Sequence, residues 1–144
     1  MKNQDYTTTI NANVTAEEAL ISISSVSKWW AKKFEGSAQK VGDTFTVRFG
    51  ETFVTFKIAE SIAGMKTVWL VTDCNLHWLD DKTEWMGTKV VWDVTTKKDS
   101  RQVTMTHVGL VPGMECYDNC ENGWNGHVQQ SLLHLMTEGT GFPQ

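Results

Sequence analysis

The chain has little of what marks a nucleic-acid-binding or a membrane-spanning protein. Its 144 residues include 13 Lys and Arg against 17 Asp and Glu, and no basic run is longer than Lys97-Lys98. Because nucleic-acid binding draws most of its affinity from basic side chains on phosphates, we exclude that class of partner. No apolar run approaches the roughly 18 residues that span a bilayer, and residues 1–15 hold no secretory signal. We therefore expect no membrane insertion.

Cysteine is also scarce. Three Cys, an odd number, together with six Met fit a reducing compartment, so we expect a cytoplasmic protein. Cys116 and Cys120 share a helical face and would hold a soft metal only if His107 or His127 came close. The usual paired Cys-x-x-Cys signature is missing, and Cys is commonly buried in any case. We expect neither a metal, nor a cofactor, nor a disulfide.

Familiar catalytic motifs are absent as well. We find no Ser nucleophile elbow, no phosphate loop and no His-Glu-x-x-His motif, and no repeat or linker. His127 and His134 lie seven residues apart on one helical face, which leaves general acid–base chemistry in a water-poor pocket as an alternative. The favoured interpretation is that His107 is a buried, hydrogen-bonded histidine and that His134 is partly solvated.

What the chain does have is apolar bulk. Hydrophobic residues make up 40% and charged residues 21%, with seven Trp and six Phe. A chain of this size buries roughly 68–70% of its unfolded surface, so one domain over residues 1–144 is expected. An aromatic-lined cleft is a common form of small-molecule site. Trp78 and Trp85 flank Asp80-Asp81-Lys82, a polar loop that is either a cavity lid or a long hairpin connection.

The first third of the chain predicts a strand and two short helices. Residues 5–12 alternate weakly and are rich in Thr, which favours a strand. Thr15-Ala16-Glu17-Glu18 has the form of a capping box, so a helix begins there and runs to about Ile23. A second helix is expected from Val26 to about Lys33, and it carries Trp29-Trp30.

From Thr44 onward the hydrophobic period changes to two. A turn at Gly50-Glu51 pairs Val47 with Val54 and Phe45 with Phe56, which puts both apolar sets on one face. The hairpin that turns at residues 63–66 closes with either parity. Either Trp69 and Val71 or Val68, Leu70 and Cys74 therefore point inward.

The last hairpin turns at Lys98-Asp99. It pairs Val94 with Val103, Trp92 with Met105 and Val90 with His107, so large apolar residues meet on one face. Six strands then form an antiparallel meander whose apolar face needs a cover.

A long amphipathic helix supplies that cover. Apolar residues recur at steps of three and four from Tyr117 to about Glu138, and Gly139 suits the position after the last helical residue. Gly123 and Gly126 each cost about 1 kcal/mol inside a helix and are expected to allow close backbone approach. A helix that begins only after Gly126 is an equal alternative.

Several segments together resemble one protein family. They are Trp29-Trp30 with Gly42-Asp43-Thr44-Phe45, Thr106-His107-Val108-Gly109-Leu110, Glu115-Cys116 through Cys120, Gly123-Trp124, Leu132-Leu133, and Gly139-Thr140-Gly141-Phe142-Pro143. On these segments nearly the whole chain resembles the START-like (SRPBCC) superfamily, and within it the family named for the activator of heat-shock-protein-90 ATPase. The resemblance implies an α+β helix-grip fold, with a six-stranded curved antiparallel sheet wrapped on the long C-terminal helix and two short helices after the first strand.

The resemblance also implies an apolar cavity between sheet and helix, which binds lipids, hormones or other hydrophobic molecules in many relatives. Carriers, chaperone regulators, cyclases and polyketide-processing enzymes share the fold, so the fold alone does not settle the function. We favour a protein that binds a small hydrophobic molecule or lipid, as a monomer or a homodimer. The alternatives are an interaction protein with a chaperone partner, and an enzyme that uses His107 or His127 as acid or base.

The expected ligand site combines both lines of reasoning. The register of the last hairpin puts Trp92, Met105 and His107 on the covered face, and the helical stripe aims Trp124 towards it. His127 adds a polar group that would orient a ligand. The predicted ligand-binding residues are Trp30, Trp92, Met105, His107, Trp124 and His127.

Overall fold

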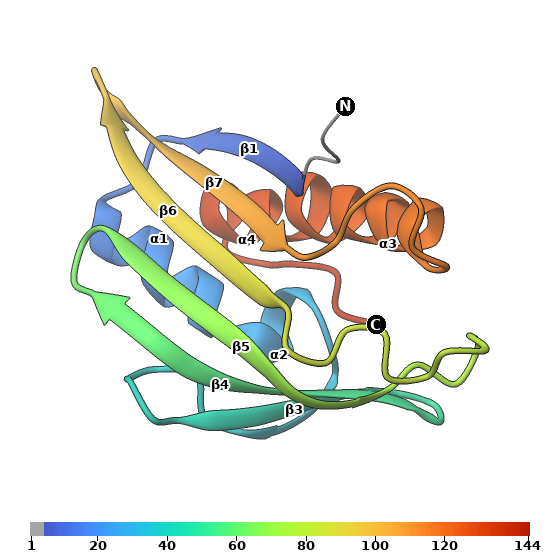
Figure 1. Ribbon diagram of the computed structural model, residues 1–144. Helices are drawn as coiled ribbons and strands as arrows, with labels where there is room; N and C mark the ends of the chain where they lie inside the picture. Colours follow the sequence, from blue (N-terminus) through green and yellow to red (C-terminus); the bar gives the residue numbers. More distant parts are fainter. Residues whose placement is uncertain (1–4) are drawn as a thin grey trace.

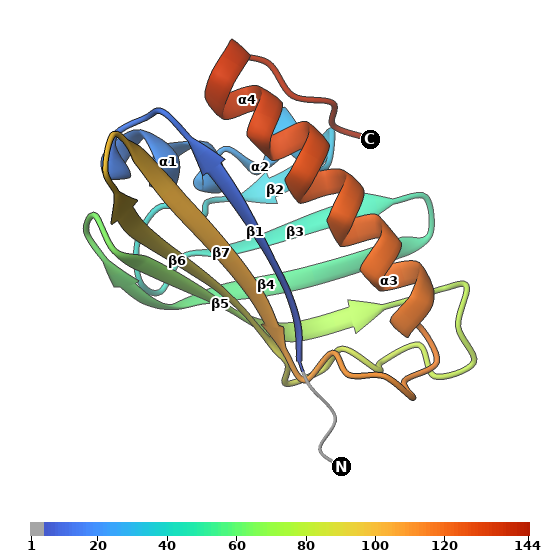
Figure 2. The same ribbon diagram turned by 90° about the horizontal axis from the view of Figure 1, so that it is seen from above.

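The computed structural model describes residues 5–144 and has helices on the concave side of a curved antiparallel sheet (Figures 1 and 2). The strands are β1 (Tyr6–Ala12), β2 (Lys33–Gly36), β3 (Thr44–Phe49), β4 (Thr52–Ile62), β5 (Lys66–Asn75), β6 (Lys89–Lys97) and β7 (Ser100–Val108). The helices are α1 (Ala16–Ser24), α2 (Val26–Trp29), α3 (Tyr117–Trp124), the π-helix η1 (Asn125–Leu132) and α4 (Leu133–Glu138). In residues 5–144 no helix is both long and apolar enough to cross a membrane.

The sheet has seven strands in the order β1-β7-β6-β5-β4-β3-β2, so the expected count of six was wrong. The additional strand is β2, which pairs with β3 at the sheet edge where the sequence predicted the end of the second helix. That helix, α2, already ends at Trp29. Gly36 has a φ of +99°, and a Cβ there would lie 2.2 Å from the carbonyl oxygen of Thr44. Only glycine therefore fits this close approach to β3.

Both hairpin registers read from the sequence are confirmed. Phe45 is opposite Phe56 and Val47 opposite Val54 in the first hairpin. In the last hairpin Trp92 is opposite Met105, and Val90 is opposite His107. A short turn and a strict period of two leave a single register that buries the large residues, which explains why these predictions succeed.

In the hairpin between β4 and β5, the inward-facing residues of β5 match neither of the two expected sets completely. Trp69 and Val71 are buried opposite Ile58 and Phe56, yet Cys74 is also buried, opposite Val54. A register shift between Thr55 and Phe56 inserts an extra residue in β5 and so returns Cys74 to the inner face. The inner set therefore draws on both alternatives.

The C-terminal helix runs without a break from Tyr117 to Glu138, through α3, η1 and α4, and lies across the sheet (Figure 2). Its early start rules out the alternative that it begins after Gly126. Gly139 ends it with a φ of +85°, as expected. The capping box of α1 is also present, because Thr15 Oγ1 accepts from the Glu18 N–H at 3.0 Å and Glu18 Oε1 accepts from the Thr15 N–H at 2.9 Å.

The π-helical turns have a cause in the sequence. Cys120, Trp124, Val128 and Leu132 are all buried, and they are spaced by three steps of four residues. In an α-helix each such step overshoots a full turn by about 40°, so the last residue would rotate well away from the sheet. The wider π turn keeps these side chains on the sheet side. Gly126 does not serve close packing, since a Cβ there would meet nothing within 4 Å, and the same holds for Gly123.

Candidate functional site

Indole rings fill the interior between the sheet and the C-terminal helix. Trp30 stacks on Trp69 with ring centroids 6.2 Å apart, and Trp69 lies 5.2 Å from Trp92. Trp92 in turn meets Trp29 edge-on at 5.6 Å and Trp124 at 6.4 Å. All five side chains are buried. This part of the interior is packed core rather than open cavity.

A small pocket lies at one edge of this aromatic core. Its volume is about 140 Å³. Its lining residues carry no formal charge other than through a histidine, and they are Trp30, Phe49, Thr52, Val54, Leu76, Trp78, Trp85, Asn119, Cys120, Gly123, Trp124 and His127. An apolar cavity of about 150 Å³ is large enough for benzene. The pocket therefore suits a group the size of one aromatic ring.

Three parts of the fold converge on the pocket. The turn between β3 and β4 supplies Phe49 and Thr52, and the C-terminal helix supplies Cys120 and Trp124. The connection from β5 to β6 supplies the third wall through residues 76, 78 and 85. Trp78 remains 48% exposed, which places it at the pocket mouth. The polar loop is therefore a wall of the pocket as well as a hairpin connection.

Two carboxylates tie this loop to the start of the C-terminal helix. Glu115 accepts hydrogen bonds from the backbone N–H groups of Asp80 and Asp81 at 2.8 and 3.0 Å. Glu84 accepts from the N–H groups of Glu115 and Cys116 at 2.8 and 3.0 Å. The hydrogen bonds from Asp81 and Asp80 lower the pKa of Glu115 below its ordinary value. These hydrogen bonds in both directions hold the loop that carries Trp78 and Trp85 against the start of the C-terminal helix.

His107 forms the centre of a buried hydrogen-bond chain. Trp124 Nε1 donates to His107 Nδ1 at 3.1 Å, so His107 carries its proton on Nε2 and donates to Thr88 Oγ1 at 2.9 Å. Thr88 Oγ1 then donates to the carbonyl oxygen of Trp85 at 2.7 Å. Burial lowers the pKa of His107 to about 3. Both ring nitrogens are therefore occupied, Nδ1 by Trp124 and Nε2 by Thr88, and the expectation of a buried, hydrogen-bonded histidine matches this geometry.

His127 differs from His107 in having its ring nitrogens uncommitted. Within residues 5–144 neither nitrogen has a hydrogen-bond partner, and the imidazole lies 6.1 Å from the Trp30 ring and 6.5 Å from the Trp124 ring. Burial lowers its pKa to about 4, so the ring is neutral at pH 7. A neutral imidazole offers one donor and one acceptor to a ligand.

The predicted ligand-binding residues divide into two groups. Trp30, Trp124 and His127 line the pocket. Trp92, Met105 and His107 are fully buried behind it and do not line it. The sequence analysis did not assign the other lining residues to the site. Trp78 and Trp85, which flank the polar loop, were the available signal for part of this lining.

The thiols of Cys116 and Cys120 lie close together beside the pocket. Trp85 Nε1 donates to Cys116 Sγ at 3.3 Å, and both cysteines are buried and unbridged. The hydrogen bond with Cys116, and then burial, raises the pKa of Cys120 above its ordinary value. Across residues 5–144 no three His, Cys, Asp or Glu side chains are grouped as a metal ion would need.

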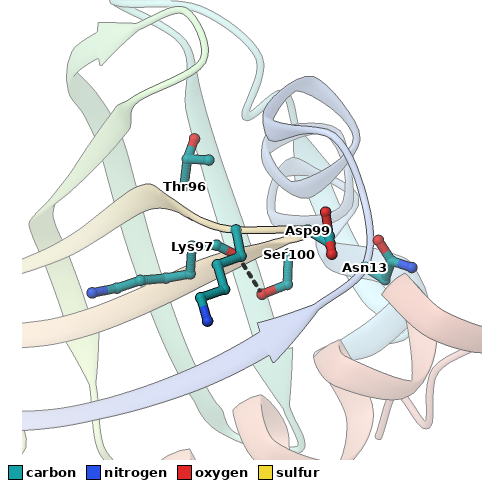
Figure 3. Close-up of a pocket in the computed structure, with 6 residues that line it drawn as sticks. Asn13, Thr96, Lys97, Asp99 and Ser100 are labelled. Atoms are coloured by element: carbon teal, nitrogen blue, oxygen red, sulfur yellow. Dashed lines mark hydrogen bonds between the residues drawn. The ribbon is translucent and has the colours of Figure 1, made fainter.

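Figure 3 shows another hollow, which lies at the tip of the β6–β7 hairpin. It is lined by Asn13 and residues 96–100, and the Ser100 hydroxyl donates to the carbonyl oxygen of Lys97 at 3.2 Å. The hollow is broad and open to solvent. A larger hollow of about 1020 Å³ lies where Leu20 of α1, Phe34 of β2 and Thr67 of β5 are among the lining residues. Neither of these hollows contains a predicted site residue, so the apolar pocket remains the candidate site.

Solved structures with the same fold come from several bacterial proteins. No protein-family model matches the sequence, and no curated protein matches it either. The Aha1 dimer from Colwellia psychrerythraea is 21% identical over 98% of this chain and 100% of its own, with a TM-score of 0.76. DynU16, a putative protein of the dynemicin biosynthetic locus, is 14% identical over 97% of this chain and 49% of its own, with a TM-score of 0.71.

A third similar structure is CalU16 from Micromonospora echinospora. It is 8% identical over 93% of this chain and 76% of its own, with a TM-score of 0.64. At these identities the likeness establishes architecture and leaves function open. The chain shares the helix-grip fold of these structures, a curved antiparallel sheet with a long C-terminal helix across it.

Proposed function

We propose that this chain binds a small hydrophobic molecule by enclosing one ring-sized apolar group in the pocket beside the C-terminal helix. The pocket itself carries the proposal, because it is apolar and opens at Trp78 while the interior directly behind it is packed with indole rings. We further propose that the protein works in the cytoplasm.

The size of the pocket sets the ligand class and the affinity. Enclosing a single ring removes roughly 150 Å² of apolar surface from water, which is worth about 4 kcal/mol before association costs. A net gain of this size would correspond to about 1 mM, so after association costs a bare ring binds in the millimolar range or more weakly. A lipid chain or a fused-ring system exceeds the volume of about 140 Å³. The natural ligand then adds affinity through atoms outside the pocket.

Carrier or sensor activity fits the site better than acid–base catalysis. His107 has no free nitrogen, because Trp124 and Thr88 occupy both. His127 has free nitrogens, but its lowered pKa makes it a weak base at pH 7. Its role in the proposal is to orient a ligand by hydrogen bonding.

Calorimetric titration with toluene tests the proposal. We expect saturable toluene binding in the millimolar range, because one ring fits the pocket. Val54→Phe and Thr52→Phe extend into the pocket from neighbouring positions on one face of β4 and should each abolish toluene binding. Val108→Phe makes the same kind of change at a half-exposed site outside the pocket and should leave binding intact. Absence of toluene binding to the unaltered protein would refute the proposed function.

A further inference from the structure

A polar groove of about 230 Å³ adjoins the apolar pocket along the C-terminal helix. It lies between the helix and the final residues of the chain, which run back beside it (Figure 2). Its lining is Asn122, Gly123, Gly126, His127, Gln130, Ser131, Phe142 and Gln144. Gly123 and His127 line both hollows. The His127 imidazole, next to the bare backbone of Gly123, therefore separates the two hollows.

The final residues are fixed in place as the outer wall of this groove. Gln144 donates from its backbone N–H to the Trp30 carbonyl at 3.0 Å and accepts from the Lys32 N–H at 3.0 Å. The Ser131 hydroxyl donates to the Trp29 carbonyl at 2.6 Å and accepts from the Phe142 N–H at 2.7 Å. These bonds use the Ser131 hydroxyl fully. They leave the side-chain amides of the groove as its free polar groups.

The helix residues beneath the groove keep it open at a cost in stability. Glycine inside a helix costs about 1 kcal/mol relative to alanine. Neither Gly123 nor Gly126 needs to be glycine for packing, since a Cβ at either position would meet nothing within 4 Å. The same stretch also holds the π-helical turns, a rare geometry that is frequent at functional sites. What both glycines provide is space beside His127.

The chemistry of the groove is neutral and hydrogen-bonding. Asn122, Gln130 and Gln144 are exposed and present side-chain amides, which make no hydrogen bond within residues 5–144. No Asp, Glu, Lys or Arg side chain lines either hollow, and His127 is uncharged at pH 7. A carboxylate would therefore find no cationic side chain to pair with in the lining. A neutral amide or hydroxyl would find donors and acceptors.

We infer that the groove is a second subsite, and that the ligand is an uncharged two-part molecule. Its ring occupies the apolar pocket, and a neutral amide or hydroxyl group passes His127 into the groove. This inference rests on the proposed function, because the ring must bind for the polar group to be placed. It adds the polarity and charge of the ligand, which the apolar pocket alone does not specify.

Three probes separate the subsites when their dissociation constants are compared by calorimetry at pH 7. They are toluene, which has the ring alone, phenylacetamide, which adds a neutral amide, and phenylacetate, which adds a carboxylate of the same shape. We expect phenylacetamide to bind about tenfold more tightly than toluene, the gain of one or two net hydrogen bonds. Phenylacetate should bind at least tenfold more weakly than phenylacetamide.

Two variants remove the polar subsite without touching the apolar pocket. Gly126→Leu extends a side chain into the groove from a helical position with open space, and Gln130→Met removes an amide at constant length. Each should reduce the phenylacetamide advantage to less than threefold while toluene binding stays unchanged. Gln102→Met, the same substitution on β7, is the matched control and should change neither constant.

The outcomes distinguish the two levels of the proposal. If toluene does not bind, the proposed function is refuted and this inference falls with it. If toluene binds but phenylacetamide gains nothing, or keeps its gain in both variants, the groove is not a subsite and only the inference is overturned. Tighter binding of phenylacetate than of phenylacetamide would likewise overturn the neutral character assigned to the ligand.

Discussion

Replacing His107 with leucine should destabilise the protein in a manner that depends on pH. At pH 7.5 the change leaves the buried Trp124 indole N–H without its acceptor, which costs about 1–3 kcal/mol, and removes the bond to Thr88, worth about 1 kcal/mol. The free energy of unfolding should therefore fall by about 3 kcal/mol. Leucine has a similar volume, so little of this loss comes from a cavity.

The sign of the pH effect follows from the lowered pKa. In the unfolded chain the pKa of His107 is near its ordinary value of 6.5, whereas in the folded protein burial lowers this pKa to about 3. The stability gained from a neutral His107 is thus fully present above pH 6.5 and is lost as the pH falls towards 3. The loss is about tenfold in the folding equilibrium per pH unit, so two units remove about 3 kcal/mol. His107→Leu lacks this loss, and the two proteins should become equally stable near pH 4.5.

Urea denaturation followed by tryptophan fluorescence at pH 7.5, 6.5, 5.5 and 4.5 measures this convergence. His77→Leu is the control, since His77 is exposed and paired only with Glu51 at 2.7 Å, and it should cost less than about 1 kcal/mol. A stability difference between wild type and His107→Leu that is the same at every pH would refute the buried neutral imidazole. No difference at pH 7.5 would refute the hydrogen-bond chain.

Three further outcomes are expected. Trp29→Phe should destabilise the protein by about 1 kcal/mol more than Trp92→Phe in urea denaturation, because Trp29 Nε1 donates to the Ile23 carbonyl at 3.1 Å while Trp92 Nε1 has no partner among residues 5–144; equal costs would contradict this. Gly126→Ala should raise the free energy of unfolding by about 1 kcal/mol, and a loss of stability would show that the glycine is needed for packing. Metal analysis should find no stoichiometric zinc, and the double variant Cys116→Ser with Cys120→Ser should fold with a modest loss of stability; one zinc per chain that disappears in this variant would overturn the expectation.

The sequence predicted the sheet best where two constraints met. At Gly50-Glu51 and Lys98-Asp99 a short turn fixes which residues pair, and the period of two fixes which side they face. Only one register satisfies both. Thr15 and Glu18 were equally decisive, because a capping box lies within one turn of the chain and needs no tertiary partner.

The sequence failed where the cause of a feature is distant in the chain. Strand β2 has one apolar residue, Phe34, so it shows no period, and it forms because β3 offers an unpaired edge. The register shift opposite Thr55 has no local signature. The π turns did leave a trace in the repeated four-residue steps of the buried stripe, from Cys120 to Leu132, which would have identified them.

The candidate site was half anticipated for the same reason. The strand register decides which side chains face the helix, and the sequence predicted this correctly for Trp92, Met105 and His107. Lining a void depends on which facing residues are large enough to close the space, and Trp29 and Trp69 close it around Trp92. Met105→Trp should therefore overpack the core and destabilise the protein, because Met105 is fully buried and does not line the pocket.

The most direct test of the account is a crystal structure of the protein soaked with bromobenzene, located by the anomalous scattering of bromine. We predict one well-occupied bromine site with the ring in van der Waals contact with Trp30, Trp124 and His127, next to the opening at Trp78. A ring bound among Trp92 and Met105, or a pocket without bromine at saturating concentration, would contradict the claim that this chain binds a ring-sized group beside its C-terminal helix.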